Sequence, residues 1–307
     1  MFSSERLKGI DVFVCVADCG SFKAAAERLN LTASAVSKAI ARLEGRLQAR
    51  LFQRTTRSLA LTDAGTAFYR TCSGVLADLE EAELALNAEH TELRGRVRID
   101  LPGTFGRSQV LAAVLRFARE HPGLQPHITF SDSAIDPLEA GVDIAVRLGG
   151  SELWPAALGH RCLGREWHLF CASPDYLRRH GTPLTDQDLE RHQCIAYGWV
   201  DGRVSPWNFA TGRPGESERR VMSASCVVGD GEGLLMTVLD GYGIAQLPSW
   251  LVKQQLAQGT LVEVLPQWAS EGQAIHLLWL KSRQGLPKVS ALIETLDACL
   301  MLANGKP

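Results

Sequence analysis

Hydroxyl, ammonium and guanidinium groups recur between residues 32 and 42, at spacings that would place them on one surface of a helix. They belong to Thr32, Ser34, Ser37, Lys38 and Arg42. A helix enters the major groove of DNA when its leading side chains are small or form hydrogen bonds with base edges and phosphates. The spacing therefore predicts a surface that recognises a double helix.

Two helices and a turn are expected to position these side chains. Ser21 is a suitable N-cap for a first helix, residues 30–32 form the turn, and Thr32 or Ser34 caps the second helix. The second helix carries an apolar stripe at spacings of four and three, made of Val36, Ile40, Leu43 and Leu47. An ordinary amphipathic helical hairpin in any protein core would show the same pattern, so the helices alone leave both interpretations open.

The segment that follows favours a DNA-recognising surface over an ordinary helical hairpin. Residues 51–61 are short, β-like and basic at the tip, which indicates a two-stranded wing. Arg54 and Arg57 would then be available for phosphates or the minor groove.

Residues 7–61 closely resemble the winged helix-turn-helix of the LysR-type transcriptional regulators. The matching pieces are Phe13, residues 20–22, 24–26, 35–37, 42–44 and 51–52, Arg54, and residues 61–65. The resemblance implies a DNA-contacting set made of Ser21, Thr32, Ala33, Ser34, Ser37, Lys38, Arg42, Arg54 and Arg57. Ala33 stands where members often carry Gln, so one base contact is expected to be missing or replaced. Gln48 stands where Gly often ends the recognition helix, so we expect a non-glycine residue at positive φ.

Charge is distributed unevenly along the chain. Residues 1–60 hold ten Lys or Arg against five Asp or Glu, whereas the remaining residues hold twenty-two against twenty-nine. This asymmetry predicts that DNA contact is confined to the N-terminal end.

Length and composition set the broad class. A chain of 307 residues with 46% hydrophobic content is expected to form two or three globular domains. It contains no apolar run long enough for a membrane span and no secretory signal, so we expect a cytoplasmic protein. The eight cysteines form no C-x-x-C pair and are expected to be small buried hydrophobic residues, with a redox pair of Cys194 and Cys226 as the alternative.

A long helix is predicted over residues 62–90. It carries a heptad-like seam of Phe68, Cys72, Val75, Leu79, Ala82 and Leu86. A core helix of a single domain is one interpretation. The family resemblance implies a linker helix that pairs with a second copy, which would give a homodimer or homotetramer and select a pseudo-palindromic operator.

The rest of the chain alternates strand-like and helix-like segments, which predicts parallel α/β sheets. Residues 102–107 are predicted to be a loop between a strand over 97–101 and a helix over 110–120. Residues 91–307 look like the effector-binding domain of the same family, which is similar in fold to periplasmic solute-binding proteins. The resembling runs are 141–147, 172–177, 241–248 and 261–266. The resemblance implies subdomain I over about 91–163 and 273–301, and subdomain II over about 164–272.

Ligands of such sheets bind at the carboxyl ends of strands, so a small-molecule effector is expected between the subdomains. The candidate contacts are Gly103, Thr104, Phe105, Ser131, Asp132, Arg147, Trp199, Gly229 and Asp230. Backbone N–H groups near Gly103 and the Thr104 hydroxyl would suit a small acid. Arg147 would pair with an anion, or equally with a neighbouring carboxylate of the chain.

Other classes of function fit less well. The eight histidines show no H-E-x-x-H spacing, and no G-x-S-x-G elbow or phosphate-binding glycine loop is present, so neither an enzyme nor a cofactor or metal site is expected. A solute-binding protein is disfavoured by the basic N-terminal segment, and an architectural DNA protein by the complete α/β body. The residue patterns and the family resemblance together predict a transcription regulator with a winged helix-turn-helix, a linker helix and a two-subdomain α/β effector domain.

Overall fold

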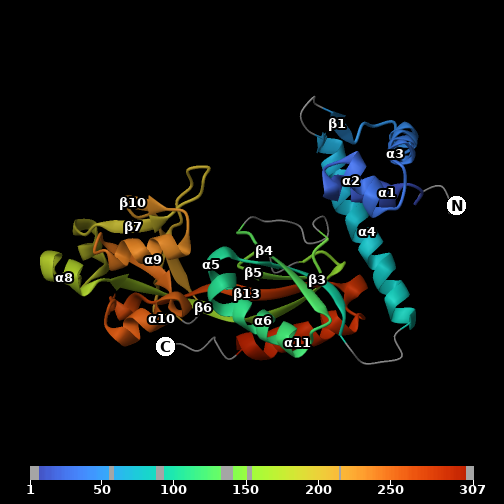
Figure 1. Cartoon of the computed structure of the whole chain (residues 1–307). Coiled ribbons are helices and arrows are strands. Elements are labelled where there is room, and N and C mark those ends of the chain that lie inside the picture. The colour runs from blue at the N-terminus through green and yellow to red at the C-terminus, as the bar shows by residue number, and fades with distance from the viewer. Residues whose placement is uncertain are drawn as a thin grey trace. The chain divides into compact units, whose positions relative to one another are not determined.

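The computed structural model describes residues 7–54, 59–87, 93–132, 141–150, 154–213 and 216–301. The chain divides into two compact units, of which the N-terminal one runs to Gly95 and the C-terminal one begins at Arg96. Figure 1 shows the elements of both units in chain colours.

The N-terminal unit consists of helices around a short hairpin. Its elements are α1 (Ile10–Cys19), α2 (Phe22–Arg28), α3 (Ala33–Leu47), β1 (Phe52–Arg54), β2 (Leu59–Leu61) and α4 (Asp63–Asn87). The strands β1 and β2 pair antiparallel, as predicted for a wing. The N-cap predictions are confirmed for Ser21, whose side chain accepts from the N–H of Ala24, and for Thr32, which accepts from that of Ala35.

The core of this unit is built on Phe13, which is fully buried and lies 5.4 Å from the ring centroids of both Phe52 and Phe68. Three residues of the predicted α3 stripe, Val36, Ile40 and Leu43, are buried in the same cluster. The prediction is wrong for Leu47, which is exposed because α3 ends at this residue and the chain then turns.

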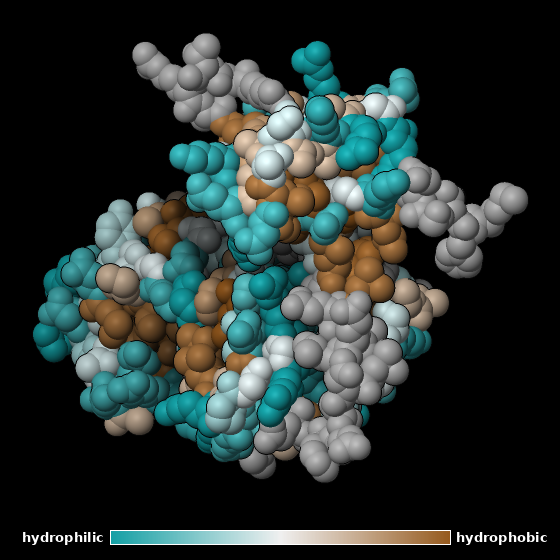
Figure 2. All heavy atoms as spheres, turned by 45° about the vertical axis from the view of Figure 1, so that its right-hand side comes forward, coloured by the Kyte–Doolittle hydropathy of each residue, from teal (hydrophilic) through white to brown (hydrophobic). Residues whose placement is uncertain are grey.

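The first turns of helix α4 pack on the core of the N-terminal unit, and its later residues are more exposed. Phe68 packs against the core and Cys72 is buried, as predicted for the first members of the seam. Val75 and Leu79 are about two-fifths exposed. Figure 2 shows one face of the molecule, on which brown hydrophobic residues lie among teal hydrophilic ones. The side chains of Ala82 and Leu86 lie outside the described residues.

A mixed sheet forms the framework of the C-terminal unit. In the described residues its order is β10-β7-β11-β6-β13-β5-β3-β4, with β12 also paired to β6. The strands are β3 (Gly95–Leu101), β4 (Leu124–Phe130), β5 (Ile144–Leu148), β6 (Leu158–Ala172), β7 (Cys194–Tyr197), β10 (Ala224–Val228), β11 (Ile244–Pro248), β12 (Val262–Val264) and β13 (Ser270–Leu280). The prediction of parallel strands holds for β3 with β5 and for β7 with β10 and β11. It is wrong at the centre, where β6 and β13 run antiparallel to each other because the chain leaves along one strand and returns beside it. They also run antiparallel to their other neighbours, β11 and β12 beside β6 and β5 beside β13.

The central strands β6 and β13 join two halves of this sheet, a first half with β3, β4 and β5 and a second half with β7, β10 and β11. Helices and a small hairpin cover both halves. In the first half, α6 (Leu111–Glu120) and α11 (Pro287–Met301) lie side by side (Figure 1). In the second half, α9 (Gly231–Leu239) and α10 (Ser249–Gln258) pack on one core cluster. A second cluster holds α8 (Pro174–His180) and the hairpin of β8 (Trp207–Ala210) and β9 (Ser217–Arg220).

Short helical turns complete the unit. They are η2 (Asp186–Arg191), η3 (Pro266–Trp268) and η4 (Lys281–Arg283). The loop predicted over residues 102–107 is instead helical, with α5 (Gly103–Phe105) followed by the π-helical turn η1 (Gly106–Val110). Gly106 lets this helical turn pack closely against β3, because a Cβ added at Gly106 would lie 2.5 Å from the Leu101 side chain.

Candidate functional site

The exposed face of α3 carries the polar side chains that the sequence singled out. Ser34, Lys38 and Arg42 are exposed on this helix, whereas Ser37 is half-buried. Thr32 caps the helix through its hydroxyl, at 3.2 Å from the Ala35 nitrogen, so that hydroxyl also serves the fold. Donors and positive charges therefore stand on the side of α3 that is opposite its buried stripe.

A shallow depression lies on this same face of the helix. It is lined by Ala35, Lys38, Ala41 and Arg42. The two alanines leave space between the two cations, so a narrow group such as a backbone phosphate or a base edge can approach the helix closely. Ala33, the first residue of α3, is also exposed, and its small side chain leaves the start of the helix accessible to DNA.

The ends of α3 hold the neighbouring elements in place. Glu44 accepts hydrogen bonds from the backbone N–H groups of Leu51 at 2.7 Å and Phe52 at 3.2 Å, which joins the wing to the helix. Gln48 ends α3 at a φ of 51°, so the predicted non-glycine residue at positive φ is confirmed. Arg54 is the last residue of β1, and Arg57 lies outside the described residues.

The candidate effector residues of the first half gather at the start of α5. The N–H of Gly103 donates to Asp132 Oδ1 at 2.8 Å, and the Thr104 hydroxyl lies 3.4 Å from Asp230 Oδ2. Gly103, Thr104 and Phe105 are all buried, whereas Asp132 is exposed. The groups expected to hold a small acid thus already contact two carboxylates of the chain itself.

An arginine that sequence reasoning missed strengthens this contact between the halves. Arg107 lies 3.6 Å from Asp230 and donates to Glu232 at 3.2 Å, and its hydrogen bond to Glu232 raises the arginine pKa. Its position directly after the Gly103–Gly106 run was the available sequence signal. Asp230 also caps α9 by accepting from the N–H of Gly233.

Arg147 is committed to an internal ion pair. Its guanidinium lies 2.6 Å from the Asp100 carboxylate, and both side chains are nearly buried. It donates further to the carbonyls of Asp100 and Val146. Of the two roles open at the sequence level, the structure shows pairing with a neighbouring carboxylate.

Of the remaining candidates, Trp199 and Gly229 lie in the second half, and Ser131 lies in the first. Trp199 is about two-fifths exposed, its ring lies 5.4 Å from Tyr197, and Arg203 lies over it. Burial, and then the charges of Asp132 and Asp230, raise the pKa of Tyr197. Gly229 follows β10 at a close approach, where an added Cβ would lie 3.1 Å from the Gly198 carbonyl. Ser131 follows β4 and is half-buried, and its N–H donates to the Leu101 carbonyl.

Comparison with known proteins decides the family. Residues 7–66 match the bacterial regulatory helix-turn-helix protein, lysR family, and residues 90–299 match the LysR substrate binding domain. The chain belongs to the LysR family of transcriptional regulators. It binds DNA through its helix-turn-helix domain and has an effector-binding domain, as LysR-type regulators do.

Relatives match over nearly their full length. An uncharacterized HTH-type transcriptional regulator of Haemophilus influenzae is 33% identical over 92% of this chain and 96% of its own. The transcriptional activator AaeR of Escherichia coli is 31% identical over 95% and 93%. Among solved structures, CrgA of Neisseria meningitidis, a LysR-type transcriptional regulator, is 28% identical with a TM-score of 0.61, covering 98% of this chain and 99% of its own.

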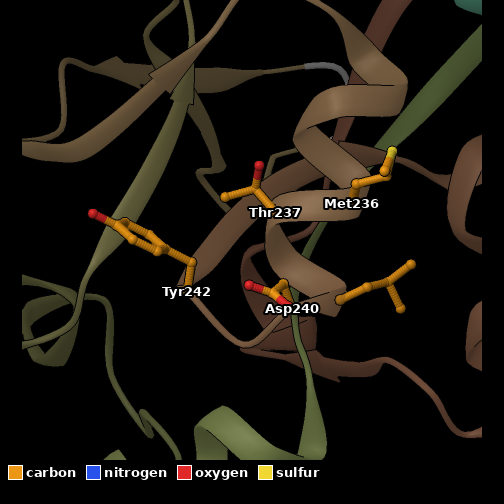
Figure 3. Close-up of a pocket in the computed structure, with 5 residues that line it drawn as sticks. Met236, Thr237, Asp240 and Tyr242 are labelled. Atoms are coloured by element: carbon orange, nitrogen blue, oxygen red, sulfur yellow. The ribbon is translucent and has the colours of Figure 1, made fainter.

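A second depression of this LysR-type regulator lies in its C-terminal unit. A shallow depression at the C-terminal end of α9 is lined by Met236, Thr237, Leu239, Asp240 and Tyr242 (Figure 3). Met236 is 68% exposed, so an apolar side chain stands at the surface beside the polar groups of Thr237 and Asp240. In the part of the chain that the structure describes, no helix is long and apolar enough to cross a membrane.

The cysteine pair considered as a redox device has one member unsuited to that role. Cys194 is 1% exposed, and burial raises its pKa to about 11, so the thiolate required for exchange is disfavoured. Burial likewise raises the pKa of Cys171 to about 12.

Proposed function

We propose that paired copies of this chain read a pseudo-palindromic operator through α3 and that a small molecule at the start of α5 controls this binding. The observation that carries the proposal is the exposed face of α3, where Lys38 and Arg42 border an alanine-lined depression. The DNA-contacting set is Ser21, Thr32, Ala33, Ser34, Ser37, Lys38, Arg42, Arg54 and Arg57.

The proposed domains are the reading head over 1–61, the linker helix over 62–90 and the effector domain over 91–307. Such a protein acts where the chromosome lies, in the cytoplasm. The named relatives are transcription regulators, which supports a regulatory rather than an enzymatic role.

DNA reading is tested with Lys38→Ala on the gene's own upstream region and on a random duplex. If Lys38 contacts a base, the substitution weakens operator binding by about 1–3 kcal/mol and leaves random-duplex binding nearly unchanged. Lys253→Ala is the matched control, because Lys253 is an exposed lysine on α10. If wild type and Lys38→Ala both bound the operator and the random duplex with one and the same affinity, specific reading would be contradicted.

The effector site is proposed around the contact between Thr104 and Asp230. A small acid that binds there would take the place of the Asp230 carboxylate on Thr104 and Arg107, and would thereby separate the halves at this point. Such a ligand shifts the equilibrium only if it binds the two arrangements with different affinity.

A thermal-shift panel of small acids, amines and neutral metabolites tests the site. Asp230→Asn keeps an N-cap on α9 but removes the competing charge, so we expect larger shifts with acids than in wild type. Thr104→Ala is expected to reduce the same shifts. A panel in which none of the three proteins responds would argue against a ligand at this position.

Two groups of exposed hydrophobic residues support self-association. Val75 and Leu79 lie on α4, and Met236, Leu239 and Tyr242 lie at the end of α9. A homodimer or homotetramer that buries them would hold two reading heads at a defined spacing, which is what a pseudo-palindromic operator requires.

A further inference from the structure

The two central strands of the C-terminal unit have an irregularity where the halves of the sheet meet. Strand β13 pairs with β5 from Ile275 to Trp279, and β11 pairs with β6 from His168 to Ala172. Between these ladders, the register of β13 against β6 shifts between Glu271 and Ala274. Gly272 and Gln273 therefore lie opposite the single residue Glu166, which is the arrangement of a β-bulge.

Glu166 fills this irregularity with a buried carboxylate. The residue is 6% exposed, and its carboxylate accepts from the Gln273 backbone N–H at 3.3 Å and from the Trp250 indole N–H at 2.8 Å. His168 Nε2 lies 3.0 Å from the same carboxylate. A buried carboxylate is tolerated when several donors surround it, so these contacts fix the side chain in one place.

The bulge residue Gly272 packs directly against the side chains of Glu166 and His168. A Cβ added at Gly272 would lie 2.7 Å from Glu166 Cγ and 2.8 Å from His168 Nε2. Glu166 is thus held by β6, by β13 and by the first turn of α10, three elements that meet at the crossing between the halves.

Trp250 extends the connection to the first half. Its ring lies 5.1 Å from that of Phe105 in an edge-on arrangement, and Phe105 is 1% exposed. Phe105 follows Thr104 in α5, where the Asp230 contact is made. An unbroken series of contacts therefore runs from the start of α5 through Trp250 to Glu166 and the bulge.

We propose that Glu166 is a positioning residue that sets the relation between the two halves and couples the start of α5 to the crossing strands. The inference rests on the proposed function in one respect, namely that a ligand at α5 regulates the protein. A change at α5 moves Phe105, Trp250 follows it, and the carboxylate passes the displacement to the Gln273 backbone.

Glu166→Gln in the full-length protein tests the coupling by hydrogen exchange with mass spectrometry. The amide keeps the shape, but its NH₂ group faces other donors, so the contacts at the bulge weaken. We expect exchange to rise roughly tenfold both in peptides over 270–275 and in peptides over 102–106, because lost hydrogen bonds to a buried charged group make local opening easier. Unchanged exchange over 102–106 would overturn the proposal.

Trp250→Phe supplies a milder variant, since it removes the indole donor and keeps a ring against Phe105. It is expected to raise exchange over 102–106 as well, and the double variant with Glu166→Gln should add little, as expected for residues in one series of contacts. Full additivity at 102–106 would contradict the coupling.

Asp143→Asn is the matched control. Asp143 is 3% exposed, and its partners Arg283 and the Arg98 N–H both belong to the first half. It should lower stability without raising exchange over 270–275, and a rise there equal to that of Glu166→Gln would overturn the assignment. Absence of operator protection in a separate footprint would remove the proposed function, while the exchange result would stand independently.

Discussion

Gln48 holds a backbone conformation that L-residues with a Cβ seldom adopt. Its φ is 51°, and its side chain partly compensates by donating to the Gly45 carbonyl at 2.7 Å. We predict that Gln48→Gly raises the free energy of unfolding by about 0.5–1 kcal/mol, since glycine adopts this conformation without the Cβ penalty. Urea titration followed by circular dichroism measures the change. Gln48→Ala keeps the Cβ and loses the hydrogen bond, so it should lower stability, and the opposite order of the two variants would contradict the argument.

His192 introduces a pH dependence of stability. The Tyr176 hydroxyl accepts from the Gln193 N–H at 2.9 Å and lies 3.1 Å from His192 Nδ1, to which it donates when that nitrogen carries no proton. That arrangement requires a neutral imidazole. Burial, and then the charge of His180, lower the pKa of His192 below its ordinary value of 6.5. The unfolded chain therefore takes up the proton first as the pH falls.

We predict that the contribution of His192 to the free energy of unfolding decreases as the pH falls below about 6.5 and levels off once the pH lies below its folded-state pKa. His192→Gln should flatten part of this decrease in urea titrations at several pH values. His127, whose pKa is also lowered by burial, should account for the part of the decrease that remains. Replacing the exposed His160 with Gln is the control, and a slope that is the same in both variants would exclude His192 as a cause.

At the scale of elements, two helix glycines have opposite roles. A Cβ at Gly65 in α4 would lie 2.0 Å from the Leu51 carbonyl oxygen, whereas nothing lies within 4 Å of a Cβ at Gly45 in α3. Gly65→Ala is predicted to displace α4 from the base of the wing, at a cost of roughly 1–3 kcal/mol or more. Gly45→Ala is predicted to stabilise the N-terminal unit by about 1 kcal/mol, through helix propensity alone. Thermal unfolding compares them, and equal melting temperatures would refute the packing argument.

At the scale of the whole molecule, the apolar end of α9 is predicted to be covered by a second copy. Met236→Glu places a charge in the depression shown in Figure 3 and should shift the protein toward smaller species in analytical ultracentrifugation. Val200→Glu is the control, because Val200 is a fully exposed hydrophobic residue in a turn of the same unit. Identical sedimentation of both variants and wild type would remove α9 from the interface.

The sequence by itself determined the local elements of the N-terminal unit and the family. Caps at Ser21 and Thr32, the stripe from Val36 to Leu43 and the positive φ of Gln48 depend on short-range periodicity and backbone sterics, which neighbouring residues specify. Leu47 shows where that logic ends, because exposure at the last turn depends on where the chain goes next.

Only the tertiary structure decided which polar groups meet. Arg147 pairs with Asp100, Thr104 with Asp230, and Glu166 with Trp250, and each pair is separated by 47 or more residues along the chain. Periodicity places a side chain on a face but carries no information about which distant residue faces it. Pairing across the sheet arises from strand order and from the bulge at Gly272, and these follow from the packing of the whole unit.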